Sequence, residues 1–65
     1  METFVIYKTH YNNERGWIRN IRETPPSAVI EDFQKTMKDL GRPTGITWKL
    51  FKGDLIGAMI ETKNI

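Results

Sequence analysis

Two arginines and a tryptophan at alternating positions are the residues best suited to recognition chemistry. Arg15, Trp17 and Arg19 lie two residues apart, and Arg22 follows shortly after. Residues two apart share one face of a β-strand, so these three side chains point the same way. An indole can stack on a base while guanidinium groups hold phosphates, and the same residue types are enriched where proteins contact each other. The segment therefore predicts a binding surface.

Three interpretations of this surface remain open. It can contact a protein, it can contact nucleic acid, or Trp17 can simply cover the core while the arginines stay solvated. Acidic residues interrupt any continuous track of positive charge that a nucleic acid would need. They are spread along the whole chain: Glu14, Glu23, Asp39, Asp54 and Glu61. We therefore expect a protein partner in preference to nucleic acid.

The chain also contains the residue types of a catalytic triad, in His10, Ser27 and Asp32. His10 is the only histidine and Ser27 the only serine, and neither has a partner at a diagnostic spacing. A 65-residue chain rarely builds the pocket and oxyanion site that such a triad needs. No spacing of ligands indicates a metal, and no glycine-rich loop indicates a bound phosphate. We expect no enzyme, no cofactor and no small-molecule substrate.

Length and composition limit the number of domains and the location of the protein. Residues 1–65 make a single small domain with a net charge of +2 and no cysteine. No apolar run approaches the roughly 20 residues of a membrane span, and the start of the chain lacks the layout of a signal peptide. These features predict a cytoplasmic protein that does not enter a membrane.

One helix is expected between Thr24 and Gly41. Thr24 suits the N-cap and Pro25 the first helical position, while Gly41 can close the helix in a left-handed conformation. Apolar residues between them recur at helical spacing: Val29, Ile30, Phe33, Met37 and Leu40.

Strands are expected on both sides of this helix, over 3–11, 16–23, 46–52 and 55–62, because β-branched and aromatic residues gather there between turn signals. The order ββαββ predicts an α+β fold, in which one helix covers one face of a four-stranded, mostly antiparallel sheet. The inner face is expected to hold Phe4, Ile6, Ile46, Trp48, Leu50, Ile56, Ala58 and Ile60.

The other sheet face would then stay uncovered and apolar. Large exposed apolar patches are uncommon on monomers, so we expect this face to be buried against a second copy in a homodimer. The expected self-association face comprises Val5, Phe51, Leu55 and Met59.

These observations predict a small protein-binding modulator of the inhibitor, antitoxin or adaptor type, of the size that phages and mobile elements often carry. Its contact surface is expected to comprise Arg15, Trp17, Arg19, Arg22, Tyr7 and Tyr11. The first alternative is a small nucleic-acid-binding protein that uses the strand of Arg15, Trp17 and Arg19. The second is a structural subunit that binds only its own copies.

Overall fold

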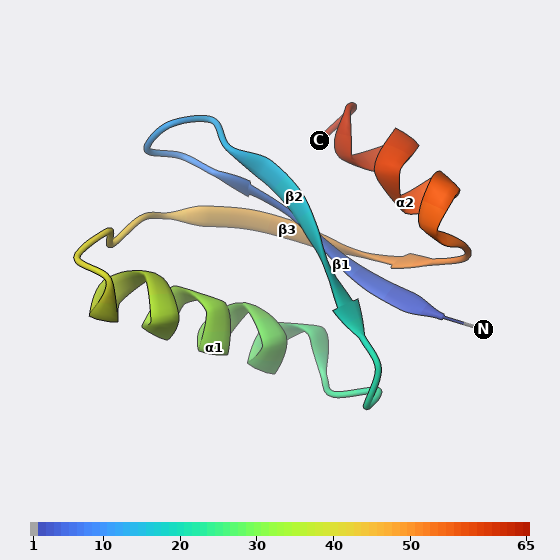
Figure 1. The fold of residues 1–65 in the computed structure, drawn as a ribbon, viewed down its shortest axis with the longest axis horizontal. Helices are drawn as coiled ribbons and strands as arrows, with labels where there is room; N and C mark the ends of the chain where they lie inside the picture. Colours follow the sequence, from blue (N-terminus) through green and yellow to red (C-terminus); the bar gives the residue numbers. More distant parts are fainter. Residues whose placement is uncertain (1) are drawn as a thin grey trace.

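The computed structural model describes residues 2–65 and contains five elements. In chain order they are β1 (Thr3–Thr9), β2 (Arg15–Asn20), α1 (Pro26–Asp39), β3 (Ile46–Lys52) and α2 (Leu55–Thr62). The strands form one antiparallel sheet in the order β2-β1-β3. The two helices lie on opposite sides of this sheet, α1 mainly against β3 and β1, and α2 mainly against β2 and β1 (Figure 1). The α+β class is confirmed.

The predicted fourth strand is wrong, because Leu55–Thr62 forms a helix. The side chain of Asp54 accepts a hydrogen bond of 2.7 Å from the backbone N–H of Gly57 and caps the first turn. Apolar residues four apart then line one side of the helix. They form two pairs, Leu55 with Met59 and Ile56 with Ile60.

The central strand β1 is buried on both faces. Phe4 lies on the α2 side, where its ring meets that of Phe51 with centroids 6.4 Å apart. Tyr7 lies on the α1 side, where its ring stacks against Phe33 with centroids 4.6 Å apart. The side chains with the least exposure accordingly come from both sides of the sheet: Phe4, Val5, Ile6, Thr9, Ile30 and Ala58. The sheet thus separates two thin cores, each closed by one helix.

The predicted inner face is also wrong, because it combined residues of the first and third strands that lie on opposite sides of the sheet. It placed Phe4 and Ile6 on the same side as Trp48 and Leu50 of the third strand. In the structure Phe4 lies opposite Phe51, and Leu50 lies opposite Val5. Directly opposite residues share a face, so an offset of one residue moves every side chain of β3 to the other side of the sheet.

Helix α1 begins one residue later than expected. Pro25 is its N-cap, Pro26 takes the first helical position, and no side chain caps this end, so the predicted cap by Thr24 is wrong. The C-terminal end is as predicted. Gly41 has φ 74°, and the N–H of Arg42 donates to the Met37 carbonyl at 2.8 Å in a Schellman arrangement.

Neither helix within residues 2–65 combines the length and the apolar character that crossing a membrane requires.

Candidate binding surfaces

Strand β2 forms one edge of the sheet and pairs only with β1 among the described residues. The N–H of Thr9 donates to the Glu14 carbonyl at 2.8 Å, so these two residues are a hydrogen-bonded pair of the antiparallel β1–β2 ladder. Hydrogen-bonded and non-hydrogen-bonded pairs alternate in an antiparallel ladder, so the even-numbered residues of β2 direct their backbone groups toward β1. The odd-numbered residues direct N–H and C=O outward along the free edge: Arg15, Trp17 and Arg19.

The side chains of these three residues share one side of the sheet, as their alternation predicted, and it is the side that carries α2. Trp17 is half-buried, and its ring meets Phe4 edge to face with centroids 5.5 Å apart. The guanidinium of Arg15 donates to the Lys63 carbonyl, just beyond α2, at 2.7 Å. The indole ring of Trp17 therefore covers part of the core, as one of the three interpretations expected. The backbone N–H and C=O of Trp17 still face outward at the edge.

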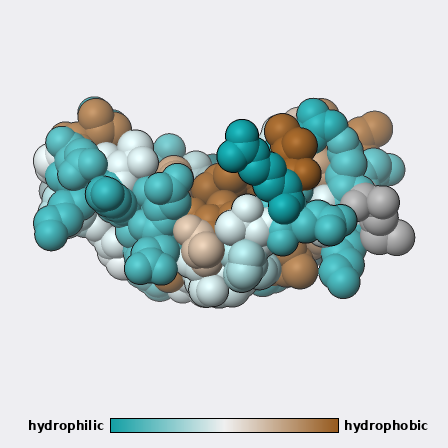
Figure 2. All heavy atoms as spheres, turned by 90° about the horizontal axis from the view of Figure 1, so that it is seen from below, coloured by the Kyte–Doolittle hydropathy of each residue, from teal (hydrophilic) through white to brown (hydrophobic). Residues whose placement is uncertain are grey.

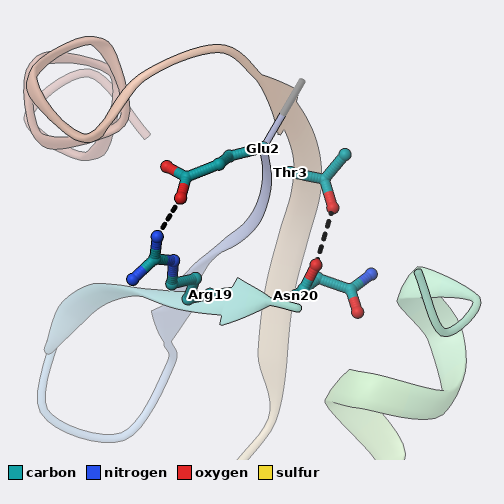
Figure 3. A network of polar contacts seen from close by, with 4 residues as sticks. All are labelled: Glu2, Thr3, Arg19 and Asn20. Carbon is teal, nitrogen blue, oxygen red and sulfur yellow. Dashed lines mark hydrogen bonds and ion pairs between the residues drawn. The ribbon is translucent and has the colours of Figure 1, made fainter. Parts of the chain in front are cut away.

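Arg19 holds the other end of β2 against the start of β1. Its guanidinium forms an ion pair with the carboxylate of Glu2, and both side chains remain about half exposed. Beside this pair, the hydroxyl of Thr3 donates to the Asn20 carbonyl at 3.2 Å (Figure 3). Part of the positive charge at this end of β2 is therefore neutralised within the protein.

An open groove runs along the α1 side of β2. We call it the α1-side groove; its volume is about 520 Å³ and most of its exposed lining is apolar. Helix α1 packs mainly on β3 and β1, which leaves the α1 side of β2 only partly covered. From the α1 side the molecular outline dips between two raised ends, and apolar atoms gather in the dip (Figure 2). The residues that line this groove include Ile18, Arg19, Arg22, Val29, Asp32 and Phe33.

A second groove, of about 420 Å³, lies between β2 and α2 on the opposite side of the sheet. We call it the α2-side groove. It is lined by Trp17 and by apolar side chains of the helix, together with two basic residues. Its members include Arg15, Trp17, Ile56, Met59, Ile60 and Lys63. The free edge of β2 thus has an apolar groove on each of its two sides.

The outer side of α2 is an exposed apolar surface, which we call the α2 face. Its members Leu55, Ile56, Met59 and Ile60 are 44%, 69%, 50% and 57% exposed. No charged side chain interrupts it, because Glu61 turns inward to form an ion pair with Lys49 of β3. Sequence reasoning missed Ile56 and Ile60, although their spacing of four residues carried the signal.

Two other predicted contact residues lie away from the edge of β2. Tyr7 is beneath α1, on the opposite side of the sheet from Trp17. Burial raises the pKa of Tyr7 above its ordinary value of 10.0, and the nearby carboxylate of Glu14 adds to the rise. Tyr11 lies in the loop after β1 and is 86% exposed. Arg22, by contrast, lines the α1-side groove together with Arg19.

The predicted self-association face divides between two places. Val5 is fully buried on the α1 side, and Phe51 is half-buried on the α2 side, where its ring closely approaches Gly57. Only Leu55 and Met59 lie together on an exposed surface, the α2 face. A helix on each side of the sheet accounts for this division.

The residue types of a triad are not brought together. His10 Nε2 lies 2.6 Å from the hydroxyl oxygen of Thr47 on β3, whereas Ser27 and Asp32 are exposed on α1. Within residues 2–65, no group of three His, Asp or Glu side chains is arranged to hold a metal ion.

No protein-family model, curated protein or solved structure matches this chain.

Proposed function

We propose that this protein works by binding another protein and not by catalysis, and that the partner lies along the outer edge of β2. One observation carries the proposal: the unpaired edge of Arg15, Trp17 and Arg19 has an apolar groove on each side. Apolar surface is the main driving force for association, and Trp and Arg are enriched at its energetic centres. An inhibitor, antitoxin or adaptor needs such a surface and no catalytic group.

The charges around the edge favour a protein over nucleic acid. The ion pair between Arg19 and Glu2 reduces the charge available for a phosphate, and Asp32 lines the α1-side groove. Nucleic-acid surfaces are usually dominated by Lys and Arg, with acidic residues kept apart. The apolar lining of both grooves suits inserted side chains better than a phosphate backbone.

A charge-reversal pair tests this function. The double variant Arg15→Glu, Arg19→Glu changes the edge, and Lys35→Glu, Lys38→Glu makes the same charge change on the exposed side of α1. Each protein is immobilised and exposed to two portions of a lysate, one treated with nuclease and one untreated. We expect a protein that the wild type and the α1 variant retain and the edge variant loses. Equal retention by all three would overturn the proposal, as would retention that disappears with nuclease and falls steeply with salt.

We propose further that the α2 face pairs with the α2 face of a second copy. With the twofold axis perpendicular to the helices, the two copies of α2 lie antiparallel, so each helix N-terminus meets the C-terminus of the other. Asp54 at the start of α2 would then approach Lys63 and Arg15 near its end. The apolar residues between these charges would fill the seam. The charge pattern of the helix is therefore complementary to itself.

A further inference from the structure

We propose that the edge of β2 accepts an extended segment of the partner as a fourth strand of the sheet. The inference rests on the proposed function and specifies the mode of binding and the chemistry of the partner. The outward N–H and C=O groups of Arg15, Trp17 and Arg19 present the hydrogen-bonding pattern that a further strand would complete.

The two grooves fit the alternation of side chains along such a strand. Successive side chains of a strand point to opposite faces of its sheet. Those on one face of the added strand would enter the α1-side groove beside Ile18 and Phe33. Those on the other face would enter the α2-side groove beside Trp17 and Met59.

Charge specifies which segment fits. Of the basic residues at the two grooves, Arg15, Arg22 and Lys63 form no ion pair within residues 2–65, whereas Arg19 is paired with Glu2, and the single acidic residue that lines either groove is Asp32. The α2-side groove includes Arg15 and Lys63 and no acidic residue, whereas on the α1 side Asp32 offsets the charge of Arg22 and the central side chain of β2 is Ile18. The partner segment would therefore place acidic side chains toward α2 and apolar ones toward α1. Its sequence would alternate acidic and apolar residues.

A second copy of β2 fits the same edge poorly. If two β2 strands paired about a twofold axis at Trp17, Arg15 of one would lie opposite Arg19 of the other. If the axis passed through Ile18, Arg19 of one copy would lie opposite Trp17 of the other. Arg15 and Arg19 of both copies would still lie close together along the interface between the two strands. Like charges directly opposite across strands are destabilising. We therefore assign this edge to a different protein and the α2 face to the second copy.

The binding test uses a capped synthetic peptide of about eight residues in which Glu and Val alternate. We expect it to shift the backbone amide NMR signals of Arg15, Trp17 and Arg19 and to slow their hydrogen exchange. Two control peptides have the same length: one carries Glu and Val in separate blocks, and one replaces Glu by Lys. Both should bind about tenfold more weakly or not at all. Binding of the three peptides with equal affinity would overturn the proposal, as would no binding by any of them.

Backbone hydrogen bonds are tested without changing the protein. In one peptide the residues whose N–H groups face β2 are N-methylated, and in a second the alternate residues are. Only the first peptide should lose binding, by about tenfold or more.

A second test changes the protein. Arg19→Pro removes one outward N–H and should weaken binding by about tenfold, whereas Arg19→Ala keeps that N–H and should weaken binding less.

These variants separate failure of the binding mode from failure of the function. If the lysate partner depends on Arg15 and Arg19 but is retained by Arg19→Pro, and N-methylation has no effect, the protein-binding function stands and strand addition is wrong. If the charge-reversal variant retains the same proteins as the wild type, the function itself is wrong.

Discussion

The ring of Trp17 stands edge-on against the ring of Phe4, with centroids 5.5 Å apart and an interplanar angle of 88°. This geometry places the positive edge of one ring against the negative face of the other. It also fixes β2 against the central strand on the α2 side of the sheet. One aromatic pair thus supports the strand whose outer edge we propose as the binding site.

Replacement of Trp17 by alanine should destabilise the protein. The half-buried ring loses its contact with Phe4, and we expect a loss of about 2 kcal/mol in the free energy of unfolding, or roughly 10 °C in Tm. Tyr11→Ala removes a ring that is 86% exposed and should leave Tm almost unchanged. Thermal denaturation followed by circular dichroism checks both, and equal effects would contradict the assigned packing.

Asp54 tests the helical assignment of the last element. Asp54→Ala removes the hydrogen bond to the N–H of Gly57 and should cost about 1 kcal/mol. Asp54→Asn keeps an oxygen that can accept this bond and should have little effect. Urea denaturation measures both variants. If alanine and asparagine behaved alike, the cap would not be holding α2.

Tyr7 predicts a loss of stability in alkaline solution. Its pKa is raised in the folded protein, so the folded state holds the phenolic proton when the unfolded state has released it. The contribution of Tyr7 is therefore fully present below about pH 10 and is lost as pH rises through the folded pKa. Urea denaturation between pH 8 and 11 should show this decline. Tyr7→Phe should flatten it, and an unchanged slope in that variant would exclude Tyr7 as its source.

The α2 face predicts the oligomeric state. Wild-type protein should form dimers as its concentration rises, whereas Ile56→Glu, Ile60→Glu should remain monomeric in light scattering. The two side chains are 69% and 57% exposed, so their replacement should leave the fold of the monomer intact. Leu40→Glu changes another exposed apolar residue, outside the α2 face, and serves as the control. A double variant that dimerises like the wild type would rule out this face.

The two proposed partners should compete. Met59 and Ile60 line the α2-side groove and also belong to the α2 face. A segment seated in the groove would therefore weaken dimerisation, and dimerisation would weaken binding of the segment by the same factor. Light scattering of the wild type with increasing amounts of the alternating Glu-Val peptide should show a shift toward the monomer. The Lys-Val peptide should produce no such shift.

The elements that sequence reasoning predicted best have strong local signals. Ile46–Lys52 was predicted with the bounds that the structure shows, because apolar and polar residues alternate there between two glycines. The C-terminal end of α1 followed from Gly41, whose positive φ closes the helix. Such signals depend on a few neighbouring residues and need no knowledge of the rest of the fold.

The last element was mispredicted because its sequence satisfies two periodicities. Almost every residue of Leu55–Ile60 is apolar, so alternation and helical spacing fit equally well. Only the cap by Asp54 distinguishes them, and a Gly-Asp pair also resembles a hairpin turn. The register of β1 against β3 was mispredicted for a different reason. The residue that lies opposite Phe4 is distant in sequence, so no local pattern identifies it.

The side of the strand on which the residues of the candidate site lie could be predicted, but their surroundings could not. Alternation correctly placed Arg15, Trp17 and Arg19 on one side of a strand. It could not show that Glu2 pairs with Arg19, because that contact depends on the neighbouring strand. The two grooves depend on where each helix lies across the sheet, which no local pattern in β2 determines.

The sheet order also constrains how the chain acquires its structure during synthesis. The first strand made is the central one, and its second neighbour, β3, begins only at Ile46. Until then β1 and β2 can form only a two-stranded hairpin with α1 against one face, and the face that carries Phe4 and Ile6 stays uncovered until α2 is made. The most apolar stretch of β1, Phe4 to Ile6, would remain open to a ribosome-associated chaperone or a protease over this period. The core on the α2 side of the sheet can therefore close only after the last element of the chain has been synthesised.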